Sequence, residues 1–461
     1  MFFVDTIEVA GLGNRSYLAG GGREAVVVDP PRDVDRVIAA AARRGVRISH
    51  VVETHVHNDY VTGGPELARL TGAAYLVPAG ARVSFERTPV RDGYSAVVDA
   101  DAGLALRALA TPGHTPHHTS YVLEEGGAAV AVFTGGSLLI GTVGRPDLVE
   151  PRLTEDLARA QHASARRLAD ELPDETAVLP THGFGSFCSA GRAEGGATTI
   201  GKEKSANEAL TRDVDAFVAD LLAGLDEVPA YYAHMGPSNA AGPAPVDLTP
   251  PAVADADEIA ARLAAGEWVV DLRNRVAFAE GHVAGSFNFE AEGQLAIYLA
   301  WLIPWGRPVT LLAESAGQLA AAQRELVRVG VDRPAAAAIG EPSAWVREGE
   351  HLAAFRRATF ADLAELADRA GRYPGDGLVV LDVRRSSERA GGFIEGSVHI
   401  PVHTLHRRLD EIPAGEVWVH CAGGMRAAIA ASLLDAAGRE VVAVDDAFTA
   451  AEKSGLTVRT A

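Results

Sequence analysis

The chain has 461 residues, of which 48% are hydrophobic and 22% charged, which is ordinary for a soluble protein of two or three domains. A formal net charge of −19 argues against binding to nucleic acid, because no basic stripe is present to release counterions from a phosphate backbone. The sequence shows no signal peptide, no run long enough to span a membrane and only two cysteines, so we expect a cytoplasmic protein without disulfides.

Residues 1–240 alternate short β-branched runs with turns and amphipathic helices. Apolar residues at helical spacing predict helices over 33–45 and 153–172. Several of the predicted strands end in turns that carry His or Asp, which is how sheet scaffolds present reactive groups. The predicted strands are 24–30, 48–55, 73–80, 104–114, 129–136 and 176–182.

Residues 234–255 are rich in Pro, Gly and Ala and predict a linker. Beyond it, residues 268–289 and 378–401 share one pattern: an apolar strand, Asp-x-Arg, a helical turn and a Gly-x-x-x-Gly-Ser corner. In each copy a second apolar strand then leads into a helix. We interpret this as an internal duplication of roughly 100 residues.

Three motifs at predicted strand ends carry histidine. "THVHNDY" supplies His55, His57 and Asp59, "TPGHTP" supplies His114, and "LPTHGF" supplies His182. A single histidine is more often structural than a ligand, but three such motifs in order favour a metal site. Imidazole nitrogen suits Zn and Fe.

With these motifs, residues 1–240 resemble the metallo-β-lactamase superfamily, and "TPGHTP", "GTVGRPDL" and the C-terminal repeats resemble its persulfide dioxygenases. The resemblance implies an αββα sandwich. It also implies oxidation of a thiol persulfide, usually glutathione persulfide, to sulfite and free thiol at a mononuclear non-haem iron. In that family the iron is held by the residues matching His55 and His114 and by an aspartate, for which this chain has Gly136. The family's histidine at position 60 is Tyr60 here.

Loss of the carboxylate should weaken Fe(II) binding, since a hard anionic ligand is removed. We expect one metal ion, Fe(II) with Zn as the alternative, with His57 or Asp59 completing the ligand set. An empty, vestigial site is a second reading. Two metals are disfavoured by Gly136 and Tyr60.

Other residues near these motifs have two readings each. Tyr60 either contacts a ligand or is a packed aromatic residue. Arg145 either pairs with Asp147 or binds carboxylates of a peptide thiol. Cys188 has no basic sequence neighbour to lower its pKa, and we predict a structural role for it.

Cys421 lies between an apolar strand and a helix, in the Gly-rich stretch "CAGGMR". The backbone N–H groups around Gly423 and Gly424, the helix N-terminus and Arg426 should favour a thiolate, so we predict a nucleophile. The stretch, with "LDVR" and "GSVHIP", resembles rhodanese, which carries sulfur as a cysteine persulfide. Its loop from Cys421 to Arg426 is the short form, whereas related phosphatases have one more residue.

The first copy keeps Asp271, Arg273 and His282 but has Ala313, Glu314 and Gln318 in the corresponding loop, so it cannot carry sulfur. We therefore predict an α/β protein of three domains. They are a metallo-β-lactamase-like domain (1–240), a rhodanese-like domain without an active cysteine (252–350) and a rhodanese-like domain with one (358–461).

The expected function is persulfide dioxygenase-like oxidation coupled to sulfurtransferase activity, in the metabolism of hydrogen sulfide and sulfane sulfur. Expected partners are a small thiol or persulfide and thiosulfate or sulfite, with no nucleic acid or membrane; a homo-oligomer is an open alternative. Rival hypotheses are a metal-dependent thioester hydrolase resembling glyoxalase II, and a metal-free scaffold serving the C-terminal sulfurtransferase.

Overall fold

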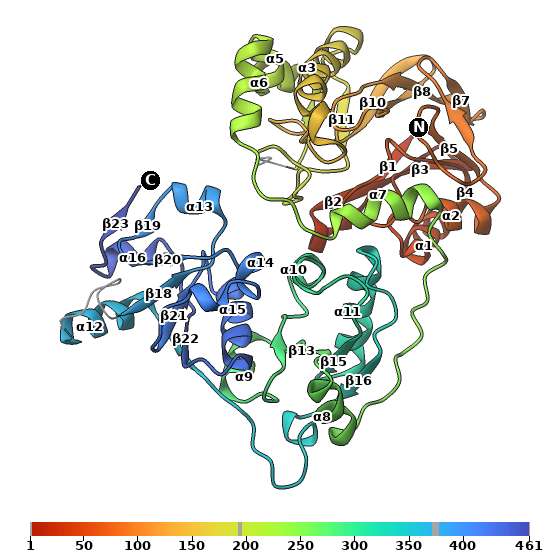
Figure 1. Ribbon diagram of the computed structural model, residues 1–461. Coiled ribbons are helices and arrows are strands. Elements are labelled where there is room, and N and C mark those ends of the chain that lie inside the picture. The colour runs from red at the N-terminus through yellow and green to blue at the C-terminus, as the bar shows by residue number, and fades with distance from the viewer. Residues whose placement is uncertain (1, 192–195, 371–377, 461) are drawn as a thin grey trace. The chain divides into compact units, whose positions relative to one another are not determined.

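The computed structural model describes residues 2–191, 196–370 and 378–460 (Figure 1). The chain forms two compact units, one of residues 1–246 and 327–330 and one of residues 247–326 and 331–461. Each unit has its own sheets and its own hydrophobic core. Among the described residues, no helix is both long enough and apolar enough to cross a membrane.

The first unit is built on two sheets. Its strands are β1 (Phe3–Val9), β2 (Asn14–Gly20), β3 (Glu24–Val28), β4 (Arg47–Val52), β5 (Ala74–Pro78), β6 (Thr88–Val90), β7 (Ser95–Asp99), β8 (Leu104–Ala110), β9 (Thr119–Glu125), β10 (Ala128–Gly135), β11 (Ala177–Pro180) and β12 (Thr198–Thr199). Within the described ranges, one sheet has the order β1-β2-β3-β4-β5-β6 and the other β12-β11-β10-β9-β8-β7. A buried cluster that includes Val26, Leu106 and Phe133 packs between them.

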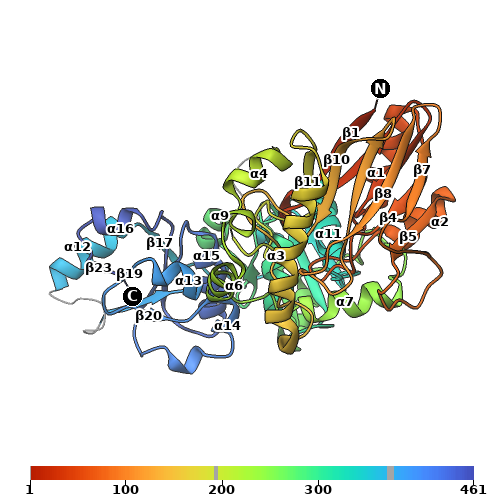
Figure 2. The ribbon, with the colours of Figure 1, turned by 90° about the horizontal axis from the view of Figure 1, so that it is seen from above.

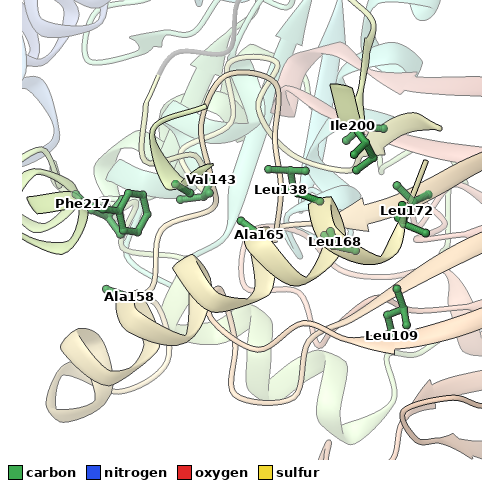
Figure 3. Packing of buried hydrophobic residues seen from close by; sticks show 14 of the residues in the cluster. Leu109, Leu138, Val143, Ala158, Ala165, Leu168, Leu172, Ile200 and Phe217 are labelled. Atoms are coloured by element: carbon green, nitrogen blue, oxygen red, sulfur yellow. The ribbon is translucent and has the colours of Figure 1, made fainter. Parts of the chain in front are cut away.

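Helices pack on the outer faces of both sheets, and the last of them packs on the loop after β4. They are α1 (Val34–Arg44), α2 (Gly64–Thr71), α3 (Thr154–Glu171), α4 (Ile200–Ala206), α5 (Glu208–Thr211), α6 (Val214–Ala223) and α7 (Tyr232–Ala241), with 3₁₀ turns η1 (Ala10–Leu12) and η2 (Pro151–Leu153). Val37 of α1 and Leu67 of α2 share a cluster with the first sheet. The long helix α3, yellow in Figure 2, packs on the second sheet, where Leu168 shares a cluster with Leu109 of β8 (Figure 3). The predicted αββα sandwich is confirmed.

One prediction for this unit is wrong. The Pro- and Gly-rich stretch predicted as a linker from residue 234 is helical as far as Ala241, in α7. Pro237 lies inside this helix, which composition alone disfavours. Tertiary contacts override composition here: Met235 and Asn239 are buried, and the Asn239 side chain makes three hydrogen bonds to the loop after β4.

The second unit repeats one small α/β pattern. Its strands are β13 (Trp268–Asp271), β14 (Phe287–Asn288), β15 (Val309–Ala313), β16 (Ala336–Ile339), β17 (Arg356–Ala358), β18 (Val379–Asp382), β19 (Phe393–Ile394), β20 (Val398–His399), β21 (Val417–His420), β22 (Val441–Val444) and β23 (Val458–Arg459). Its helices are α8 (Ala256–Ala264), α9 (Arg275–Glu280), α10 (Leu295–Leu302), α11 (Ala316–Arg328), α12 (Phe360–Ala370), α13 (Ser386–Ala390), α14 (Val402–Leu405), α15 (Met425–Ala436) and α16 (Ala450–Lys453), with 3₁₀ turns η3 (Pro342–Ala344) and η4 (Leu409–Glu411).

The two copies have the same topology, as the duplicated sequence pattern predicts. The first sheet has the order β14-β13-β15-β16, and the second contains the matching series β20-β18-β21-β22, extended by β17. All of these pairings are parallel. The loop that carries Cys421 thus follows β21, the counterpart of β15. At that place the first copy has Glu314.

Candidate functional site

The three histidine motifs meet at one buried site in the first unit. They follow β4, which is in the first sheet, and β8 and β11, which are in the second, so both sheets contribute to the site. The His55 ring lies 4.1 Å from the ring of His57 and 4.8 Å from that of His114, measured between centroids. The His182 ring is 5.3 Å from both His55 and His114. All four side chains are at most 1% exposed.

Each of these imidazoles has one nitrogen held by a neighbouring acceptor. Nδ1 of His55 donates to Thr54 Oγ1 at 2.8 Å, and Nδ1 of His114 donates to the Arg145 carbonyl at 2.8 Å. Nδ1 of His182 donates to Asn14 Oδ1 at 3.0 Å, with Asp59 Oδ2 at 3.3 Å. We assigned these tautomers from the hydrogen-bond partners. Nε2 of each of these three rings is therefore unprotonated, and its lone pair can bind a metal ion.

His57 is held through its other nitrogen. Its Nε2 lies 3.2 Å from Asp29 Oδ1 and 3.2 Å from Glu53 Oε2, while its Nδ1 is buried without a partner among the described residues. Burial by itself would lower the pKa of His57, but the two carboxylates outweigh it and raise the pKa to about 10 when no metal is bound, so a metal ion at Nδ1 would have to displace a proton. For His114, burial lowers the pKa to about 3, so that ring is neutral.

The free nitrogens converge, which is the arrangement that metal ligation requires. Nε2 of His55 is 3.3 Å from Nε2 of His182, and one nitrogen each of His55, His57 and His182 lie within 4.8 Å of one another. Nε2 of His114 is buried and has no partner within the described ranges. Metal-binding histidines usually donate their second nitrogen to a carboxylate or carbonyl, as His114 does to the Arg145 carbonyl and His182 to the Asn14 side-chain carbonyl. The residues present therefore fit a metal ion held by imidazole nitrogen.

Asp59 and Gly136 take different places in this site. Asp59 accepts a hydrogen bond from Asn14 at 2.7 Å through Oδ2, and its Oδ1 is buried with no partner in the described part of the chain. At Gly136 an added Cβ would lie 2.2 Å from Cδ2 of His114. The His114 ring thus fills the space in which a side chain at position 136 would begin, so an aspartate there could not simply restore the lost carboxylate.

The structure places Tyr60 and Arg145 in internal contacts. The Tyr60 hydroxyl donates to the Asp29 carbonyl at 3.2 Å, and its ring lies 4.4 Å from that of His57. The Arg145 guanidinium is paired with both oxygens of Asp147 at 2.7 Å and also bonds the Asp226 carbonyl. Arg145 is 3% exposed. These contacts support the packed aromatic reading of Tyr60 and the structural reading of Arg145 rather than substrate contact.

Sequence reasoning missed several residues that hold the site. Asp29 bonds the backbone and hydroxyl of Thr54 as well as His57, and Glu53 bonds His57. Asn239 of α7 donates to the carbonyls of His57 and Tyr60, both at 2.8 Å. Asp29 and Glu53 directly follow the β-branched strands β3 and β4, and this position at a strand end could have marked them as candidates from the sequence. Asn239 gave none, because it lies in a stretch whose composition indicates a linker.

Cys188 is also buried beside the cluster, at 1% exposure. Burial raises the pKa of its thiol far above the usual range, and the nearby Asp59 carboxylate adds to this. Its Sγ lies 3.9 Å from the Tyr232 hydroxyl.

A second candidate site, in the second unit, surrounds Cys421. The cysteine is 2% exposed, and its Sγ accepts a hydrogen bond from the Gly424 backbone N–H at 3.2 Å. Gly424 has φ +96°, and a Cβ there would meet an oxygen of Asp445, so the loop requires glycine at this position. α15 begins at the next residue and directs its positive N-terminal end to the loop.

The charge of Arg426 is paired rather than free. Its NH1 and NH2 bond both carboxylate oxygens of Glu388, at 2.5 and 2.8 Å. Burial would raise the pKa of Glu388, but the Arg426 contact dominates and lowers it to about 2. Arg426 therefore orders the loop through this pair, and its positive charge acts on Cys421 less than its sequence position implies.

The copy without cysteine packs against the active copy. His282 Nε2 lies 3.1 Å from Asp435 of α15, and the Asn288 N–H donates to Ser432 of the same helix at 3.0 Å. Trp301 of α10 stacks on His403 of α14 with ring centroids 4.4 Å apart. These contacts place the copy without cysteine against α15, the helix that follows the Cys421 loop.

This fold and these two sites define a metallo-β-lactamase domain followed by two rhodanese-like domains. Residues 10–182 match the metallo-β-lactamase superfamily, and residues 255–348 and 362–454 each match the rhodanese-like domain. A crystal structure of a metallo-β-lactamase from Staphylococcus aureus subsp. aureus COL is similar with a TM-score of 0.65 and 25% identity. The similarity covers 74% of this chain and 99% of that one.

Among proteins of known activity, the mitochondrial persulfide dioxygenase ETHE1 of Homo sapiens is 29% identical over 210 residues, which are 44% of this chain and 74% of that protein. A hydroxyacylglutathione hydrolase of Parasynechococcus marenigrum (strain WH8102) is 34% identical over 169 residues, 35% of this chain. The chain spans 63% of the latter protein. Similarity to the dioxygenase, together with the rhodanese-like domains, supports a general role in sulfur metabolism.

Proposed function

We propose that the protein processes sulfane sulfur in two steps on one chain. The N-terminal domain oxidises a low-molecular-weight thiol persulfide with O₂ at one bound metal ion, Fe(II) in the first instance. Cys421 moves sulfane sulfur between thiosulfate or a persulfide and a thiol. The linkage is chemically consistent, since the substrate of one domain can be the product or cargo of the other.

The observation that carries the first step is the set of four buried imidazoles. Each has one nitrogen fixed by the protein and one left for a metal. When bound, the metal supplies open positions where O₂ and a persulfide sulfur can be brought together. His55 and His114, the residues matching the family ligands, are available for it, and His57 supplies a third nitrogen in place of the carboxylate absent at Gly136.

The chain's own residues have clear tasks around that metal. Thr54, Asn14 and the Arg145 carbonyl fix the tautomers of their histidines, and Asp29 with Glu53 orients His57. Because the four rings are at most 1% exposed, the protein keeps bulk water away from them. A small persulfide must enter through a local opening of the structure.

For the second step, the Cys421 thiolate attacks the outer sulfur of thiosulfate, so that an S–S bond forms and sulfite leaves with the electron pair of the broken bond. An acceptor thiolate then attacks the outer sulfur of the Cys421 persulfide, and Cys421 returns as a thiolate. The Gly424 N–H, already 3.2 Å from Sγ, and the N-terminal end of α15 stabilise that negative charge.

The other function to be weighed is thioester hydrolysis, which the similarity to hydroxyacylglutathione hydrolase favours. That chemistry uses a metal-bound hydroxide and gains from two metals. The aspartate and histidine absent at Gly136 and Tyr60 count against a second metal. The experiment is a direct comparison of two assays on one Fe(II)-loaded preparation: persulfide-dependent O₂ uptake and hydrolysis of a glutathione thioester. We expect the first activity, and thioester hydrolysis without O₂ uptake would select the hydrolase.

A further inference from the structure

Cys188, for which the sequence indicates only a structural role, lies where a metal ligand could be. Its Sγ, one ring nitrogen of His114 and one ring nitrogen of His182 are all within 4.8 Å of one another. This spacing suits three ligands of a single ion, since zinc bonds to sulfur and to nitrogen are about 2.3 and 2.0 Å long. The contact between Sγ and the Tyr232 hydroxyl is long, at 3.9 Å, and so holds the thiol only weakly.

Two unpartnered atoms at this place, one of them on His114 itself, point to a cation. Nε2 of His114 and Oδ1 of Asp59 are buried and lack a partner among the described residues. The His114 and Asp59 side chains are 0% and 2% exposed. Leaving such groups buried and unsatisfied is unfavourable, and more so for a charged group. A metal ion bonded to both would remove that cost.

Charge gives a third argument. With glycine at position 136, a divalent ion held only by neutral imidazoles keeps its full double charge in a buried site. A thiolate would neutralise one of these charges, as the missing carboxylate does in the related dioxygenases. Thiolate is also a soft ligand that favours zinc and iron over hard cations such as magnesium.

We propose that Cys188 is a thiolate ligand of the same metal ion that His55 and His114 hold, where it lies beside His114 and His182, with Asp59 as a further anionic ligand. The set takes a thiophilic divalent ion, zinc or iron. This inference rests on the proposed metal site and adds to it an anionic ligand that the dioxygenase resemblance does not supply.

The chain offers a direct test, because it has only two cysteines. In full-length Cys421→Ser protein, the thiol of Cys188 is the only one left. After loading with Zn²⁺, X-ray absorption at the zinc edge should show one sulfur neighbour at about 2.3 Å. Replacing Zn²⁺ by Co²⁺ should give a thiolate-to-cobalt charge-transfer band in the near ultraviolet, which separates a thiolate from a methionine thioether. Both signals should vanish in Cys188→Ser/Cys421→Ser protein.

The outcomes separate the two proposals. Bound metal with nitrogen and oxygen neighbours alone would overturn the Cys188 assignment and leave the proposed function standing. No bound metal in Cys421→Ser or in unmodified protein would overturn both. If the double variant does not fold, the sulfur neighbour and the cobalt band in folded Cys421→Ser protein still decide, since no other thiol is present.

Discussion

Asn239→Ala tests whether α7 holds the metal-binding loop. The Asn239 side chain donates to the carbonyls of His57 and Tyr60 at 2.8 Å each and accepts from the Thr62 N–H at 2.9 Å. It is 3% exposed, so water cannot readily replace these bonds. At about 1 kcal/mol per hydrogen bond, the substitution should destabilise the first unit by about 3 kcal/mol.

The assay can distinguish the two units. All five tryptophans lie at residue 268 or beyond, so tryptophan emission reports the second unit, whereas far-UV circular dichroism reports both. In urea, Asn239→Ala should shift an unfolding transition seen by circular dichroism to lower denaturant by about 1 M or more, given slopes of about 1–3 kcal/mol/M. The transition seen by tryptophan emission should stay in place.

Metal affinity gives the second readout. Release of the His57 carbonyl loosens the loop that carries the ligands, and loss of such supporting contacts typically lowers metal affinity by about 10–100-fold. The matched control is Asn58→Ala in the same loop, because Nδ2 of Asn58 has no hydrogen-bond partner among the described residues. If Asn239→Ala behaves like Asn58→Ala in both stability and affinity, α7 does not support the site as argued.

Three further predictions follow from the sites. Cys421→Ser should abolish sulfur transfer from thiosulfate to cyanide while persulfide-dependent O₂ uptake persists; residual transfer would place the nucleophile elsewhere. After treatment with thiosulfate, peptide mapping of the full chain by mass spectrometry should find the persulfide on Cys421, whose Sγ accepts the Gly424 N–H, and not on Cys188, whose pKa is raised by burial. Gly136→Ala should lower metal occupancy because its Cβ would lie 2.2 Å from the His114 ring, whereas Gly22→Ala, with open space around it, should not; equal occupancy would refute the steric argument.

The fold was predictable because its elements have local signals. The largely apolar runs before His55, His114 and His182 are strands β4, β8 and β11, and the helix expected over residues 33–45 is α1. In α1 the buried residues Val34, Val37 and Ala41 follow helical spacing, and Gly45 ends the helix in a left-handed conformation. The duplicated rhodanese-like pattern was likewise visible in sequence and recurs as one strand order.

The candidate site was only partly predictable, because the residues that orient the histidines lie far from them in the sequence. The histidines carry their own signals, but the groups that orient them come from far away: Asn14 bonds His182 across 168 positions, and Asn239 bonds the loop at His57 across 182. Such pairs leave no trace in one sequence. The pairing of Arg426 with Glu388, 38 residues earlier, is hidden in the same way, so the charge near Cys421 was overestimated.

The central claim is that the imidazole cluster holds a catalytic metal for persulfide oxidation, and O₂ uptake tests it most directly. Full-length protein is loaded anaerobically with Fe(II), its iron content is measured, and O₂ consumption is followed after addition of glutathione persulfide. The account predicts iron near one per chain and O₂ uptake with sulfite as product, lost in His114→Ala protein that still transfers sulfur through Cys421. Iron-loaded protein that consumes no O₂ with any thiol persulfide would contradict the claim and favour a non-catalytic N-terminal domain.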